Sequence, residues 1–161
     1  MTAPSASLPP PFSCPGTDGA RYADIATSTV AHRRGGTTKL LLTSGGVTNP
    51  TIRLALDDML GKPVSESTAL CIPTAMYGHP WVGPGVKAWE FISGTAENPM
   101  VDLGWKSVGV LELTALPSID DERWKPLVLE TDVLLVAGGD ALYLAHWMRE
   151  SGLADLLPSL T

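Results

Sequence analysis

Four short runs of apolar residues stand out along the chain, at 40–43, 69–72, 107–113 and 133–136. Within each run the apolar residues are nearly continuous instead of alternating with polar ones. Continuous runs of this length are typical of parallel strands whose two faces are both covered by helices. We therefore predict four buried strands.

The segment after the first run carries the period of an α-helix. Its apolar stripe consists of Ile52, Ala55, Leu56, Met59 and Leu60. Asn49 is suited to cap the start of this helix, Pro50 to occupy its first position, and Gly61 to end it.

Further helical segments are expected at 86–92, at 141–151 and, as about a half-turn, at 153–157. Ser118 and Asp121 resemble a capping box that opens another short helix, which Pro126 is expected to disturb. Strands that alternate with helices through short connections predict an α/β fold with three layers and a parallel sheet of about four strands.

The first 37 residues differ from the rest of the chain. They are rich in Pro, Ser, Thr and Gly, with Pro9 to Pro11 in a row and Gly35-Gly36 near the end, and they lack an apolar period. Such a segment buries too little surface to offset the entropy of ordering it. We predict a disordered arm over 1–37 and one α/β domain over 38–161. The alternatives for the arm are coding sequence upstream of the true start and a functional tail.

Composition and charge exclude several classes of protein. Seventeen acidic and eleven basic side chains give a net charge of −6, which argues against a nucleic-acid-binding protein. The sequence has no apolar run of eighteen residues and no signal-peptide pattern at its start, so neither a membrane span nor export is expected. Two cysteines, Cys14 and Cys71, make no disulfide framework and fit a reducing cytoplasm.

Candidate chemistry lies in the loops that follow the predicted strands, because ligands of open parallel sheets bind at the carboxyl ends of the strands. Gly138 and Gly139 follow the most apolar strand, and their backbone N–H groups could hold a phosphate, a carboxylate or a developing oxyanion. The alternative is a tight turn in which Asp140 caps the next helix. Asp140 and His79, which lies in another of these loops, are candidate substrate-binding residues.

No nucleophile is evident. Cys71 lies inside a predicted strand, where burial should raise its pKa, and Cys14 lies in the arm. The chain has no G-x-S-x-G elbow and no complete nucleotide-binding glycine pattern at 44–46. No histidine is spaced with a second histidine or a cysteine as metal ligands are, so we predict neither metal nor cofactor.

Three stretches of the chain resemble the peptidase E family of serine peptidases. They are Leu-Leu-Thr-Ser-Gly-Gly at 41–46, Ile-Pro-Thr-Ala at 72–75 and Leu-Leu-Val-Ala-Gly-Gly-Asp-Ala-Leu-Tyr-Leu at 134–144, and the likeness continues through 149–157. The resemblance implies a flavodoxin-like sheet of the class I glutamine amidotransferase type. It also implies hydrolysis of short peptides after an N-terminal Asp, with Gly138 and Gly139 beside the oxyanion hole. Asp140 stands where the family usually has Asn.

In this family a further strand and a Gly-x-Ser-x-Gly elbow follow, so the resemblance implies that the nucleophile and its histidine lie beyond Thr161. We accordingly expect an N-terminal part of such an enzyme that is inactive by itself and associates through an unpaired sheet edge. One alternative is a non-catalytic α/β module that binds a small ligand or a partner. The other is an amidotransferase-like enzyme with a cysteine nucleophile.

Overall fold

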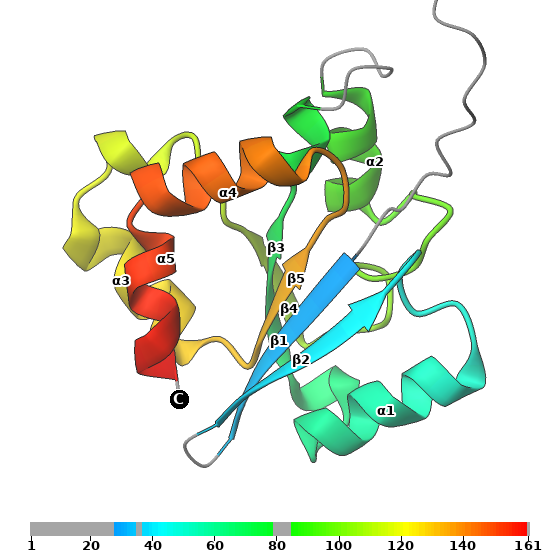
Figure 1. The fold of residues 1–161 in the computed structure, drawn as a ribbon. Helices are drawn as coiled ribbons and strands as arrows, with labels where there is room; N and C mark the ends of the chain where they lie inside the picture. The colour runs from blue at the N-terminus through cyan, green and yellow to red at the C-terminus, as the bar shows by residue number, and fades with distance from the viewer. Residues whose placement is uncertain (1–27, 35–36, 79–84, 161) are drawn as a thin grey trace, which may run out of the picture.

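The computed structural model describes residues 28–34, 37–78 and 85–160, which form one sheet between two layers of helices (Figure 1). The strands are β1 (Ser28–Arg34), β2 (Thr37–Thr43), β3 (Thr68–Ile72), β4 (Ser107–Val110) and β5 (Val133–Val136). The α-helices are α1 (Pro50–Leu60), α2 (Val86–Ser93), α3 (Asp121–Glu130), α4 (Ala141–Glu150) and α5 (Leu153–Leu156). The short 3-10 helices are η1 (Val64–Glu66), η2 (Thr74–Gly78), η3 (Leu116–Ser118) and η4 (Leu157–Leu160).

The five strands have the order β2-β1-β5-β3-β4. β3 is parallel to both of its neighbours, with Cys71 opposite Val110 on β4 and opposite Leu135 on β5. β1 is antiparallel to both β2 and β5. β2 therefore runs in the same direction as β3, β4 and β5, and the carboxyl ends of these four strands lie at the same edge of the sheet.

Each face of the sheet has its own hydrophobic core. One core contains Leu56 of α1 and Phe91 of α2, and the other contains Trp124 of α3 and Leu153 of α5. α1 and α2 therefore cover one face, and α3, α4 and α5 lie on the other (Figure 1). Within the described ranges, none of the helices combines the length and the apolar character needed to cross a bilayer.

The prediction of an α/β fold with parallel strands is confirmed for β3, β4 and β5. The predicted strand at 107–113 is shorter than expected, because β4 ends at Val110. Beyond it, the N–H of Leu113 donates to the side-chain oxygen of Thr74 (3.4 Å) instead of to a neighbouring strand. A side-chain oxygen thus takes the place of the backbone carbonyl of a neighbouring strand, and the chain leaves the sheet at this point.

The structure corrects two predictions, that of a disordered arm for its part at 28–34 and at residue 37, and that of a wholly parallel sheet of about four strands. Ser28–Arg34 form a fifth strand, β1, which pairs with β2 from Ser28–Thr43 to Arg34–Thr37 and with β5 on its other side. Hydrogen bonds to β2 on one side and to β5 on the other satisfy the backbone groups of β1. This pairing stabilises the strand although few of its side chains are apolar. The remainder of the predicted arm, 1–27 and 35–36, lies outside the described residues.

Most of the predicted helix signals are confirmed. The side-chain oxygen of Asn49 accepts from the N–H of Ile52 (2.9 Å) at the start of α1, and Gly61 ends this helix with a left-handed φ of 61°. Helices are also present close to the ranges expected at 86–92 and 141–151, as α2 and α4.

The predicted capping box is wrong. α3 begins at Asp121 after Asp120, and the hydroxyl of Ser118 donates to the carbonyl of Ala115 (2.7 Å) inside η3. Pro126 lies inside α3, and Trp124 and Val128 anchor the helix in the core on both sides of it.

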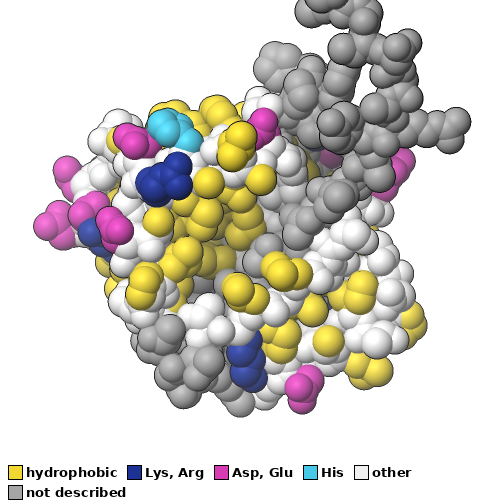
Figure 2. Space-filling model, viewed as in Figure 1, with side chains coloured by type: hydrophobic (Ala, Val, Ile, Leu, Met, Phe, Trp, Pro, Cys, Tyr) yellow, Lys and Arg dark blue, Asp and Glu magenta, His cyan; other side chains and the backbone are white. Residues whose placement is uncertain are grey.

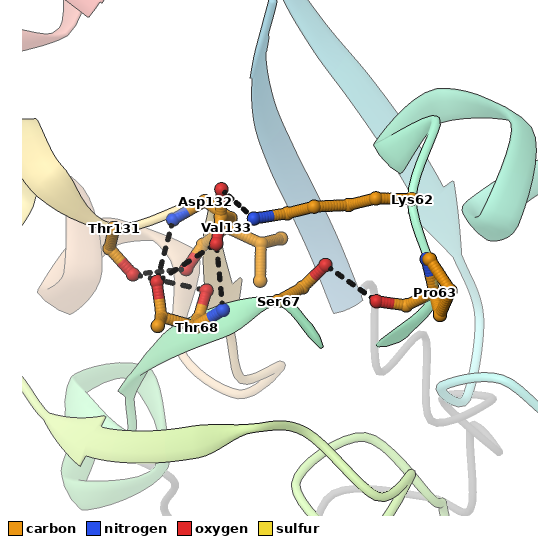
Figure 3. A network of polar contacts seen from close by, with 7 residues as sticks. All are labelled: Lys62, Pro63, Ser67, Thr68, Thr131, Asp132 and Val133. Carbon is orange, nitrogen blue, oxygen red and sulfur yellow. Dashed lines mark hydrogen bonds and ion pairs between the residues drawn. The ribbon is translucent and has the colours of Figure 1, made fainter. Parts of the chain in front are cut away.

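At the amino ends of β3 and β5, a network of polar contacts joins the two strands (Figure 3). One carboxylate oxygen of Asp132 accepts from the N–H (2.8 Å) and the hydroxyl (3.0 Å) of Thr68, and the other pairs with Nζ of Lys62 (2.8 Å). Burial favours the neutral form of Asp132, but the hydrogen bonds from Lys62 and Thr68 outweigh it and leave the pKa of this carboxyl below its ordinary value.

Asp132→Asn is expected to lower the free energy of unfolding by about 1.5–3 kcal/mol at pH 7, the value of hydrogen bonds to a charged group. Because the pKa of Asp132 is lowered in the folded state, its stabilisation is present above the unfolded pKa and is lost as the pH falls through the folded one. Urea unfolding at pH 7 and at pH 3 should therefore show a difference between wild type and variant that shrinks in acid. Asp58→Asn, at an exposed position of α1, is the control. An equal loss from the two variants at pH 7 would contradict the prediction.

Candidate functional site

The carboxyl edge of the sheet contains a topological switch point between β3 and β5. After β3 the chain continues through η2 to α2, which packs on the same face as α1. After the neighbouring strand β5 it continues to α4, which packs on the opposite face. Where adjacent parallel strands send their connections to opposite faces, a crevice forms that commonly holds the ligand of an α/β protein.

Gly139 brings the two loops of this switch point into contact. Its φ is +140°, and a Cβ at this position would lie 2.4 Å from the carbonyl oxygen of Ala75 in η2. The N–H of Asp140 donates to the same oxygen (2.9 Å). A Cβ at Gly78, at the end of η2, would lie 2.7 Å from the Cβ of Tyr143 in α4. The turn geometry weighed as the alternative for this loop is thus observed at Gly139.

Asp140 caps α4, as the alternative interpretation expected. Its Oδ1 accepts from the N–H of Tyr143 (2.8 Å). Within the described part of the chain, no hydrogen bond uses the N–H groups of Gly138 or Gly139. These two donors precede the positive end of the α4 dipole, where an oxyanion is favoured. The substrate-binding role of Asp140 stays a prediction.

Glu112 is the centre of a polar cluster at the same edge. Its Oε1 accepts from the hydroxyl of Thr74 (3.2 Å) and from both the N–H (3.3 Å) and the hydroxyl (3.0 Å) of Thr114. Its Oε2 is buried. Glu112 lies two residues beyond β4, and Gly138 lies two beyond β5, so the cluster and the glycine turn flank the end of β3.

Tyr77 of η2 lies beside this cluster. Burial raises the pKa of its phenol, and both the negative charge of Glu112 and a hydrogen bond from the phenol to that carboxylate raise it further. The side chain is 38% exposed, whereas Thr74 on the same short helix is fully buried. Tyr77 therefore lies between solvent and the carboxylate.

Cys71 is a structural residue, as predicted. It is completely buried in β3, and burial raises the pKa of its thiol to about 11. A thiol with this pKa is almost entirely protonated at neutral pH and is a poor nucleophile. An amidotransferase-like mechanism that uses Cys71 is therefore not supported.

Two other candidate residues of the sequence analysis are not among the residues that the structure describes. His79 and Cys14 lie outside the described ranges, so the role proposed for His79 stays a prediction. Glu112 and Tyr77 were not singled out by the sequence patterns. One signal for Glu112 was available, since it is a single charged residue in the otherwise apolar run at 107–113 and a buried carboxylate needs partners.

An apolar area lies on the sheet face that α4 and α5 border (Figure 2). Leu41 packs into the core on the α1 side, so its neighbours Leu40 and Leu42 point to the opposite face, where they are 60% and 63% exposed. β2 is also an edge strand. Exposed apolar side chains on an edge strand favour association, and the expected association between copies stays a prediction.

Comparisons with models of protein families, with curated proteins and with solved structures found no match to this chain.

Proposed function

We propose that this chain forms the substrate-binding edge of a serine-type peptidase of the peptidase E kind, with a flavodoxin-like sheet of the class I glutamine amidotransferase type. The observation that carries the proposal is spatial. The three stretches that resemble the family, at 41–46, 72–75 and 134–144, include the carboxyl ends of β2, β3 and β5, which lie at one edge of the sheet. The parallel order β5-β3-β4, with helices on both faces, is compatible with the proposed sheet.

In the proposed function, the N–H groups of Gly138 and Gly139 hold the carbonyl oxygen of a short peptide as it gains negative charge. Donors that are fixed before the reaction stabilise an oxyanion without a cost of reorganisation. The chemical step also needs a nucleophile and a base. Among the described residues, no serine hydroxyl is hydrogen-bonded to a histidine, so the proposal assigns neither role to them.

This absence, within the described ranges, of a paired serine and histidine favours a second candidate function, a module that binds a peptide without cleaving it. The two candidates differ in the shape of ligand that they prefer. A peptidase site is complementary to the tetrahedral, anionic transition state, whereas a binding module is complementary to the planar peptide group.

The test compares the dipeptide Asp-Ala with its phosphonate analogue, which replaces the peptide carbonyl by a tetrahedral anion. We expect the phosphonate to bind the purified chain at least about 100-fold more tightly in isothermal titration, the lower range for transition-state analogues. We expect no hydrolysis of Asp-Ala above the uncatalysed rate. Equal affinity for both ligands would favour the binding module, and failure of both to bind would overturn the proposed function.

A further inference from the structure

The glycine turn, residues 138–139, is held at both ends by the segment that follows β3. Just before the turn, the N–H of Ala137 donates to the carbonyl of Ile72 (3.0 Å). Just after it, the N–H of Asp140 donates to the carbonyl of Ala75 (2.9 Å). Ile72 is the last residue of β3 and is fixed by the sheet, whereas Ala75 belongs to η2. The direction of the two glycine N–H groups therefore depends on what holds this short helix in place.

The carboxylate of Glu112 holds η2 at two points. It accepts from the hydroxyl of Thr74 (3.2 Å), the first residue of η2, and the phenol of Tyr77 is also hydrogen-bonded to it. The same carboxylate accepts from the N–H (3.3 Å) and the hydroxyl (3.0 Å) of Thr114, in the loop that follows β4. Glu112 thus connects η2 to the neighbouring loop of the carboxyl edge.

A carboxylate is suited to this position because it offers two acceptor oxygens and, when ionised, no donor. The side chain of Thr74 is completely buried, and its hydroxyl also accepts from the N–H of Leu113 (3.4 Å). The single proton of this hydroxyl is directed to Glu112. Alanine at position 112 would leave it buried without an acceptor, which folded proteins avoid. We expect Thr74 to move in such a variant, and η2 to move with it.

We propose that Glu112 is a positioning residue for the donors of the glycine turn. It fixes η2 through Thr74 and Tyr77, and the carbonyl of Ala75 in η2 then sets the direction of the turn. This inference rests on the proposed function, because the donors that are positioned are those of the proposed oxyanion site. The role requires no contact between Glu112 and the ligand. Loss of Glu112 should therefore weaken the binding of a tetrahedral anion, which needs aligned donors, more than that of a planar peptide group.

The test measures the affinity of the full chain for Asp-Ala and for its phosphonate analogue by isothermal titration. Removal of one donor from an oxyanion site costs about 100- to 1,000-fold in rate, and misaligned donors keep part of their effect, so Glu112→Ala should weaken phosphonate binding about tenfold or more. The affinity for Asp-Ala should change by less than about threefold. Glu112→Gln, whose amide oxygen can still accept from Thr74 and Thr114, should restore most of the lost affinity.

Asp132→Asn is the matched control, because Asp132 is also a carboxylate that joins neighbouring segments through several hydrogen bonds, but at the amino ends of β3 and β5. It should lower stability without a change in either affinity. In magnetic resonance spectra of the chain without ligand, the N–H signals of residues 138–140 should shift in Glu112→Ala and stay in place in Asp132→Asn. Tyr77→Phe, which removes only the phenol oxygen, should shift these signals less and decides the question where Glu112→Ala fails to fold.

The outcomes separate this inference from the proposed function. If Glu112→Ala binds the phosphonate as the wild type does, or loses affinity for both ligands equally, Glu112 does not position the turn and the proposed function stands. The same conclusion follows if Asp132→Asn weakens phosphonate binding as much, or if the signals of residues 138–140 shift in neither Glu112→Ala nor Tyr77→Phe. If the wild-type chain binds neither ligand, the proposed function is overturned and this inference with it.

Discussion

Replacement of Trp124 by alanine is expected to lower the free energy of unfolding by about 3–5 kcal/mol, the range for removal of a large aromatic side chain from a core. Trp124 is 2% exposed and is packed between α3 and the sheet, in the core that also contains Leu70, Leu113 and Val128. Alanine would leave a cavity that β3 and its neighbours cannot fill without moving. Urea unfolding of the two proteins measures the loss.

The chain offers a matched control for this substitution. Trp89 of α2 is 68% exposed, so Trp89→Ala removes the same atoms from a position that buries little of them. We expect this variant to stay within about 0.5 kcal/mol of the wild type, as surface substitutions usually do. If the two variants lost the same free energy of unfolding, the assignment of Trp124 to the core would be wrong.

The strands that helices cover on both faces were the easiest part of the fold to predict. β3 and β5 consist almost entirely of apolar residues, and this pattern has few other interpretations. The caps at Asn49 and Asp140 were predictable for a related reason, because each side chain bonds a backbone group only three residues away. Local chemistry of this kind is visible in the sequence without knowledge of the fold.

β1 was missed because its stability comes from distant residues. The segment Ser28–Arg34 follows a region rich in Pro and Ser, and its partners are residues of β5 about a hundred positions later. A better signal was present in Gly35 and Gly36, which separate two segments that contain β-branched residues. A Gly-Gly pair in this position is a common signal for a hairpin, and β1 and β2 pair in antiparallel register from residues 34 and 37 outward.

The candidate site was predictable in its location but not in its residues. The rule that ligands bind at the carboxyl ends of parallel strands selected the loop at Gly138, Gly139 and Asp140. The rule does not show which side chains of one loop contact those of another. Thr74 and Glu112 are 38 residues apart in the sequence, and their hydrogen bond depends on the pairing of β3 with β4. Contacts of this kind need the tertiary structure.

Gly139→Ala is expected to lower the free energy of unfolding by about 2–6 kcal/mol, through two effects that add. A side chain at φ +140° strains the backbone by about 1–3 kcal/mol. The new Cβ would also lie 2.4 Å from the carbonyl oxygen of Ala75, so η2 and the start of α4 would have to separate, at a further cost of about 1–3 kcal/mol. Urea unfolding at neutral pH measures the sum.

Gly104→Ala separates the two effects, because Gly104 also has a left-handed φ (+86°) but has no atom within 4 Å of the position that a Cβ would occupy. Only backbone strain should act there, with a loss of about 1–2 kcal/mol. The difference between the two variants therefore reports the contact between the loops after β3 and β5. If Gly139→Ala cost no more than Gly104→Ala, these loops would not be packed together in solution, and the N–H groups of Gly138 and Gly139 would lack the rigid support that an oxyanion site requires.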